Sequence, residues 1–129
     1  APYEVISTAY ISAAELVRLK MIEEMLDIYY NRGGFSYTIA YLIETVGAGA
    51  FRFYEKLADF YYTSGFQHRD RKKDDQYRIL LAFARTLAQE RDEPAIEEIA
   101  LKMLTRDAEA SMNPENLKRF LRKGWEITR

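Results

Sequence analysis

The sequence predicts an all-α domain of about six helices, packed as a compact orthogonal or antiparallel bundle behind an extended N-terminal arm. Three observations lead to this prediction. Apolar residues recur at intervals of three and four from residue 12 onward, which is the period of an amphipathic helix. Glycines, prolines and N-cap residues divide the chain into segments of helical length. No strand pattern of convincing length follows residue 11.

Length and composition limit the class of protein. The chain has 129 residues, of which 48% are hydrophobic and 30% charged. A single globular domain with a real core is therefore expected. The 19 basic and 20 acidic residues give a formal net charge of -1, which argues against a strongly basic nucleic-acid-binding protein. We predict no nucleic-acid partner.

The residue types that the sequence lacks exclude several kinds of site. It has no cysteine, so disulfides, zinc–thiolate sites, iron–sulfur ligation and cysteine nucleophiles cannot form within the chain. No apolar run approaches the roughly 20 residues of a membrane span, and no signal peptide is recognisable. We expect a cytoplasmic protein without a membrane partner. Because the sequence starts at Ala1 rather than Met, we also expect a fragment of a longer protein.

The first segments are an arm and a helix. Residues 1–11 are rich in proline, β-branched residues and tyrosine, which predicts an extended connector from an upstream domain; residues 12–129 then form one helical domain. Ser12 and Glu15 form a capping box that begins a helix, and Gly33-Gly34 ends it. Its apolar face is predicted to comprise Leu16, Leu19, Ile22, Leu26 and Tyr29.

Two further helices are predicted in the middle of the chain. Ser36 is the expected cap of a short helix that passes through Tyr37, Ala40, Tyr41 and Ile43 and ends at residues 47–49. The next helix covers about residues 50–64 and ends at Gly65. One face of it carries Phe51, Tyr54, Leu57, Ala58 and Tyr61, and Phe53, Phe60 and Tyr62 widen the apolar surface, so we expect it to be central.

The C-terminal half predicts three more helices. Asp74 or Asp75 suits the start of the first, Pro94 the first turn of the second, and Asn113 with Pro114 the start of the third. Gly124 ends the last helix and Trp125 is placed in a polar tail. The apolar positions are Tyr77, Leu80, Leu81, Ala84, Leu87 and Ala88, then Ile96, Ile99, Ala100, Met103 and Leu104, then Leu117, Phe120 and Leu121.

No group of residues has the spacing of a catalytic or metal site. The single histidine, His68, lacks ligand spacing to any partner and is interpreted as a solvated loop residue. The basic run at residues 69–73 is interrupted by Asp70. The acidic pairs at 23–24, 92–93 and 97–98 point about 100° apart on a helix, so neither member can converge with the other on one substrate atom. We predict no catalytic, cofactor-binding or metal-binding residue in this chain.

Aromatic residues are the most unusual feature, with ten Tyr, seven Phe and one Trp. One hypothesis is an aromatic-lined pocket or docking face, because tyrosine suits interfaces. The favoured interpretation is a helical core with amphipathic tyrosines at its rim.

Five segments carry a resemblance to a known family: PYEVIST at 2–8, ELVRLK at 15–20, IEEMLD at 22–27, YYNRGGF at 29–35 and FYEKL at 53–57. They resemble the C-terminal helical region of cobalamin-binding-domain radical SAM proteins. This bacterial group is often labelled Fe–S oxidoreductases or, by analogy, magnesium-protoporphyrin IX monomethyl ester (oxidative) cyclases.

The resemblance implies a parent protein with a cobalamin-binding domain, then a radical SAM barrel, then a helical domain of unknown function. In such a parent, a Cys-x-x-x-Cys-x-x-Cys loop holds a [4Fe–4S] cluster that reduces S-adenosylmethionine. Those ligands cannot lie in this chain, which has no cysteine. The resemblance thus implies an accessory domain without catalysis of its own, which packs on the upstream barrel of the same polypeptide or recruits a substrate or partner.

The docking residues expected from this interpretation fall into two groups. The arm residues Tyr3, Val5, Ile6 and Tyr10 are the first candidates for interdomain contacts, and Tyr29, Tyr30, Tyr61 and Tyr62 are the second. Two alternatives stay open. One is an independent helical dimerisation or regulatory module, acting as a homodimer; the other is an autonomous enzyme, which would need converging titratable residues in a polar pocket.

Overall fold

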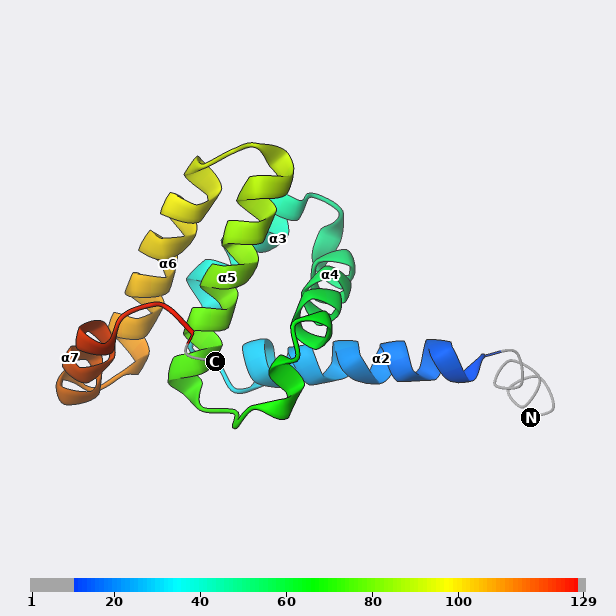
Figure 1. The fold of residues 1–129 in the computed structure, drawn as a ribbon, viewed down its shortest axis with the longest axis horizontal. Helices are drawn as coiled ribbons and strands as arrows, with labels where there is room; N and C mark the ends of the chain where they lie inside the picture. Colours follow the sequence, from blue (N-terminus) through cyan, green and yellow to red (C-terminus); the bar gives the residue numbers. More distant parts are fainter. Residues whose placement is uncertain (1–10, 128–129) are drawn as a thin grey trace.

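Six α-helices make up the part of the chain that the structure, a computed structural model, describes: residues 11–127 (Figure 1). No strand is found in this range, so the predicted all-α class is confirmed. A π-helical turn, η1 (Asp27–Asn31), continues the first helix, and a short 3-10 turn, η2 (Phe66–His68), follows the third. The helices are α2 (Ala13–Leu26), α3 (Ser36–Val46), α4 (Gly49–Thr63), α5 (Lys73–Arg91), α6 (Ala95–Ser111) and α7 (Pro114–Lys123).

The helix starts follow the predicted caps at two positions. The Ser12 hydroxyl accepts a hydrogen bond from the Glu15 backbone N–H at 3.1 Å, and the Asn113 side chain accepts one from the Asn116 N–H at 2.8 Å. The predicted cap of α3 is wrong, because Ser36 is the first residue of the helix rather than its cap. The side chain that binds the N-terminal amides of α3 comes instead from α6, as described below.

The helices form a bundle from which α2 extends. α5 and α6 lie side by side and antiparallel, and α3 packs against α6 and α4. α4 also packs against α2, which crosses beneath it and runs out of the bundle toward the N-terminus (Figure 1). α7 packs against α6 at the opposite end.

Aromatic rings fill much of the core, as the favoured interpretation of the composition predicts. A continuous chain of ring contacts runs from η1 to the C-terminal segment. Its successive ring centroids are 5.1, 4.5, 6.0 and 4.9 Å apart. The rings, in order, belong to Tyr29, Phe35, Tyr77, Phe120 and Trp125.

The C-terminal segment differs from the predicted polar tail. Trp125 is half-buried and meets the Phe120 ring edge-on. The Arg78 Nε donates a hydrogen bond to the Gly124 carbonyl at 2.8 Å, which holds this segment against α5. The sequence around Trp125 is polar, and only the position of Phe120 after folding provides its apolar partner.

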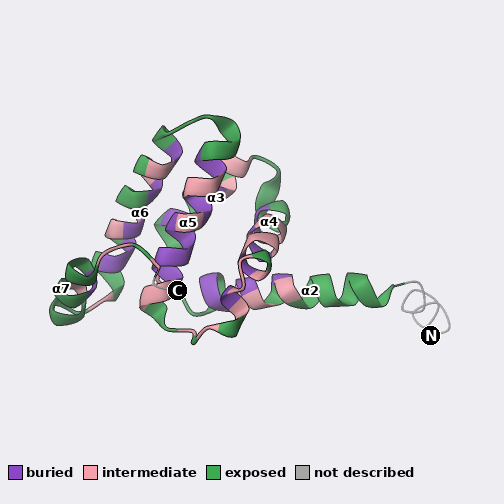
Figure 2. Cartoon of the chain, in the orientation of Figure 1, coloured by how far each residue is buried: buried purple, intermediate pink, exposed green. Residues whose placement is uncertain are grey.

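Several positions predicted on apolar helix faces are exposed, among them Leu121 of α7 at 46%. Leu16 and Leu19 of α2 are 46% and 45% exposed, and Phe51 of α4 is 60% exposed. Figure 2 shows the reason for α2: its C-terminal part meets the bundle, whereas its N-terminal part is exposed on every side. Helical periodicity identifies an apolar face, but it does not say how far along the helix a packing partner extends.

Candidate functional site

The projecting part of α2 presents three apolar side chains that the rest of residues 11–127 cover only in part. They are Leu16, Val17 and Leu19, which we call the exposed α2 surface. Val17 is 57% exposed. Isolated exposed leucines are common on proteins. Leu16 and Leu19, however, are three residues apart and are therefore neighbours on the helix surface, with Val17 about 100° round the helix from Leu16. Neighbouring exposed apolar side chains are a feature of interaction sites.

Arg18 fixes the helix at the point where it leaves the bundle. Its guanidinium donates to both Asp59 carboxylate oxygens at 3.1 and 3.0 Å, and to Glu55 at 3.0 Å. Arg52 also donates to Glu55. The hydrogen bonds from Arg52 and Arg18 lower the pKa of Glu55 below its ordinary value. Bidentate geometry of this kind gives direction as well as attraction, so the exposed α2 surface is held at a defined angle to α4.

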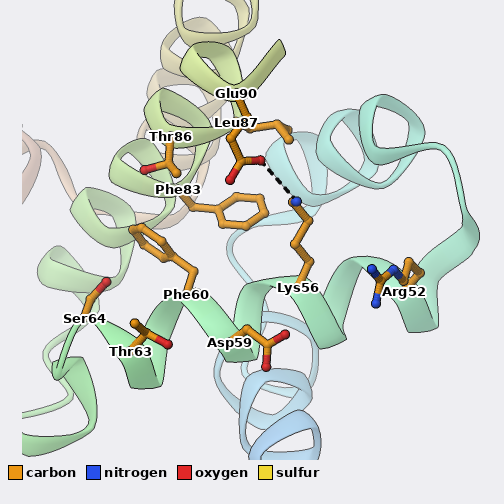
Figure 3. A pocket seen from close by; sticks show the side chains of 10 residues that line it. All are labelled: Arg52, Lys56, Asp59, Phe60, Thr63, Ser64, Phe83, Thr86, Leu87 and Glu90. Atoms are coloured by element: carbon orange, nitrogen blue, oxygen red, sulfur yellow. Dashed lines mark ion pairs between the residues drawn. The ribbon is translucent and has the colours of Figure 1, made fainter.

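A second feature is a groove between α4 and α5 with a volume of about 310 Å³ (Figure 3). The Phe60 and Phe83 rings lie between the two helices, with centroids 5.6 Å apart. The Lys56 ammonium forms an ion pair with Glu90 of α5 at 3.2 Å (Figure 3). Because Lys56 is paired with Glu90 and Asp59 with Arg18, this groove offers little uncompensated charge to a ligand.

A third feature is an apolar groove of about 540 Å³ where η1, α3 and α4 meet, which we call the aromatic groove. Its buried side chains are Tyr29, Phe35, Ile39 and Tyr54. Its more exposed lining residues are Leu26, Tyr30, Gly33, Gly34, Ser36, Ala40, Ile43 and Ala50. None of these lining side chains is charged.

The predicted docking tyrosines are separated by the fold. Tyr29 and Tyr61 are 2% and 1% exposed, so their assignment to an exposed docking surface is wrong: both rings face the core, where their hydroxyls bind Gln76. Tyr30 is 70% exposed at the aromatic groove, and Tyr62 is half-buried beside α2. The arm candidates Tyr3, Val5, Ile6 and Tyr10 lie outside the described residues.

Gln76 supplies the partner that two of these tyrosines need. The Tyr29 hydroxyl donates to its Oε1 at 2.9 Å, and its Nε2 donates to the Tyr61 hydroxyl at 3.5 Å. Tyr77 donates to the Gly34 carbonyl at 2.7 Å. The Tyr54 hydroxyl is also buried, yet it has no hydrogen-bond partner within the described chain.

The buried phenols predict a loss of stability at alkaline pH. Burial raises the pKa of Tyr29 well above its ordinary value of 10 and that of Tyr54 to about 12, the latter with a smaller contribution from Tyr30. Burial also raises the pKa of Tyr61 and Tyr77. Unfolded phenols ionise near pH 10, so the stability that these groups provide is complete below that pH. It is lost as the pH rises through their folded-state values.

Urea unfolding below pH 10 and between pH 10 and 12 measures this effect, with phenolate absorbance followed in parallel. A Tyr54→Phe variant, which removes one of these groups, should lose less stability over the same interval. Unchanged unfolding midpoints up to pH 12 would contradict the prediction.

The two arginines of the polar loop before α5 are paired with carboxylates. His68 is exposed, in accord with its interpretation as a loop residue. Within the basic run, Arg71 pairs with Glu24 of α2, and Arg69 pairs with Asp75 at 3.4 Å. In residues 11–127, no three acidic or histidine side chains lie close enough to hold a metal ion. No helix in that range is both long enough and apolar enough to span a membrane.

Asp107, a buried acidic residue that the sequence analysis did not single out, joins two helices beside the aromatic groove. Asp107 of α6 is 3% exposed, and its carboxylate accepts hydrogen bonds from the backbone N–H groups of Tyr37 and Thr38 at 3.1 and 2.9 Å. The Thr38 hydroxyl donates to it at 2.7 Å. The sequence did contain one indication that Asp107 is buried: it lies three residues after Leu104, on the buried face of α6.

Comparison with known proteins gives one match. The profile of a family described as "Protein of unknown function (DUF4080)" matches residues 1–127. No curated protein and no solved structure matches the chain.

Proposed function

Since the chain belongs to the DUF4080 family, whose function is unknown, we propose that it is a helical accessory domain that docks on a domain encoded upstream of it. More specifically, we propose that this upstream domain is the catalytic barrel of a radical SAM protein with a cobalamin-binding domain. The parent would hold the [4Fe–4S] cluster, S-adenosylmethionine and cobalamin. This chain would hold none of them and act in the cytoplasm without catalysis of its own.

The exposed α2 surface is the observation that carries this proposal. α2 is the first described helix, so a domain that precedes it in the polypeptide would arrive at its projecting end (Figure 1). Leu16, Val17 and Leu19 lie there, and Arg18 holds the helix in a fixed direction against α4. A helix with exposed leucines at the end where an upstream domain would connect is suited to docking.

The energetics favour a contact within one polypeptide. Fully burying an exposed leucine or valine contributes about 1.5–3 kcal/mol. Leu16, Val17 and Leu19 are already about half covered, so each adds roughly half of that value and the three give a small interface. A covalent connection raises the effective concentration of the two domains to roughly millimolar. A patch of this size is therefore sufficient for docking in cis, whereas a separate partner would need a larger interface.

Two experiments test the proposal. The coding sequence upstream of Ala1 should contain the three-cysteine loop in the same reading frame. In the full-length protein, a Leu16→Gln, Leu19→Gln double variant should detach the domain, which limited proteolysis between the domains and small-angle scattering both report. Leu121→Gln on α7, at a residue that is also 46% exposed, is the matched control and should leave docking unchanged.

Equal proteolysis rates for the double variant and the unmodified protein would reject the exposed α2 surface as the docking site. An upstream sequence without the three-cysteine loop would reject the radical SAM parent, while leaving the docking experiment open for whatever domain is found there.

A homodimer through α2 is the second candidate, and the same exposed leucines favour it. Leu16 and Leu19 are exposed at the projecting end. In an antiparallel pair of α2 helices, these leucines of one copy would pack against those of the other. Analytical ultracentrifugation separates the two candidates, because a dimer that the Leu16→Gln, Leu19→Gln variant dissociates supports this alternative.

A further inference from the structure

The aromatic groove differs from the other hollows of the described chain in its chemistry. It is lined by three consecutive elements that fold around it: η1 with the following loop, α3 and the start of α4. Its volume of about 540 Å³ lies within the range of small-molecule sites. Buried rings of Tyr29, Phe35 and Tyr54 form much of the wall, and no charged side chain contributes to the lining.

The Tyr54 hydroxyl is a polar group at this groove that has no hydrogen-bond partner in the described chain. Tyr54 is 4% exposed, and its hydroxyl is buried. The other three tyrosines of the core, Tyr29, Tyr61 and Tyr77, all have hydrogen-bonded hydroxyls. Buried polar groups are nearly always paired, because an unpaired one loses its hydration without compensation. Because Tyr54 also lines the aromatic groove, its hydroxyl is a donor that an acceptor bound in the groove can satisfy.

The backbone at the groove is also irregular. η1 is a π-helical turn that ends the helix begun by α2, and it contains both Tyr29 and Tyr30. It places Tyr29 in the core and leaves Tyr30 70% exposed at the edge of the groove. Wider turns of this kind are common at helix C-termini, and here the turn fixes which of the two tyrosines faces the groove from inside and which from its edge.

We propose that the aromatic groove binds an uncharged, largely apolar small molecule that carries a carbonyl oxygen, which accepts a hydrogen bond from the Tyr54 hydroxyl. The phenol remains protonated at neutral pH and is available as a donor. A charged ligand is disfavoured, because the lining has no opposite charge to offset the loss of its hydration. This inference goes beyond the docking function, since it assigns a ligand site to the accessory domain itself.

Prodan, an uncharged fluorescent naphthalene ketone, is a suitable probe for the complete 129-residue chain. Its emission shifts to the blue in apolar surroundings and responds to hydrogen bonds at its ketone. We expect saturable binding with blue-shifted emission. Tyr54→Phe keeps the ring but removes the donor, so it should weaken binding roughly three- to tenfold and remove the hydrogen-bond contribution to the emission.

Ala40→Phe tests the location of the site. Ala40 lines the groove and is exposed, so a phenylalanine there should fill the groove without disturbing the core and abolish Prodan binding. Ala110→Phe on α6, also at an exposed alanine but outside the groove, is the matched control and should bind as the unmodified chain does. Circular dichroism of each variant reports whether the fold is kept.

Three results would overturn the proposal: no saturable binding to the unmodified chain, equal binding by Ala40→Phe, or equal binding by Tyr54→Phe. The experiment uses this chain without any upstream domain. Failure here and failure of the docking proposal are therefore distinguishable.

Discussion

Asp107→Asn is expected to lower the free energy of unfolding by about 3 kcal/mol, because hydrogen bonds to a buried charged group contribute about 1.5–3 kcal/mol each. Both carboxylate oxygens accept hydrogen bonds, one from the Tyr37 N–H and the other from the N–H and hydroxyl of Thr38. Asparagine has only one acceptor oxygen, so its NH₂ group would face a backbone N–H donor. Urea unfolding followed by far-ultraviolet circular dichroism measures the loss.

The effect should be specific to the capping contact between α6 and α3. Asp70→Asn makes the same chemical change at an exposed residue and should shift stability by less than about 0.5 kcal/mol. Thr38→Val removes only the hydroxyl donor and should have an intermediate effect. If Asp107→Asn unfolds at the same urea concentration as Asp70→Asn, the carboxylate does not stabilise the start of α3.

Phe120→Ala is expected to cost about 3–5 kcal/mol, the range for removing a fully buried phenylalanine. The ring is 0% exposed and contacts Tyr77, Trp125 and the Arg78 guanidinium, which lies 4.6 Å from the ring centroid. Its removal leaves a cavity and takes away the surface on which Trp125 packs. Since the chain has one tryptophan, its fluorescence reports this contact directly.

We expect the Trp125 emission of Phe120→Ala to shift to the red under conditions where the helices remain folded. Phe51→Ala removes the same side chain at a position that is 60% exposed, so neither its stability nor its emission should change appreciably. An unshifted Trp125 emission in Phe120→Ala would mean that the C-terminal segment is held without Phe120.

Much of the fold followed from local patterns. The Ser12 and Asn113 caps are confirmed. The face of α5 that carries Tyr77, Leu80 and Ala84 is buried as predicted, because a helix covered along its length buries its whole apolar stripe. α2 shows the limit of this reasoning: Leu16 and Leu19 continue the apolar spacing, yet α4 meets this stretch through Arg18 and leaves both leucines about half exposed.

The candidate sites depended more on tertiary structure than the helices did. Tyr29, Tyr30 and Tyr54 are all aromatic residues on predicted helices, and nothing in their spacing distinguishes a paired hydroxyl from an unpaired one. The difference arises because Gln76, 47 residues away from Tyr29 in sequence, reaches the Tyr29 hydroxyl and no described group reaches that of Tyr54. Similarly, the sequence around Asp107 does not distinguish it from a solvent-exposed acidic helix residue. Its role as a hydrogen-bond acceptor depends on the packing of α3 against α6.

The sequence by itself determined the all-α class, most helix boundaries and the absence of cysteine chemistry, because helix caps, periodicity and composition are local properties of the chain. Tertiary structure alone decided which apolar residues remain exposed on α2, which tyrosines find a partner, and where the aromatic groove forms. Those properties depend on contacts between residues distant in sequence, and such contacts are fixed only when the helices pack.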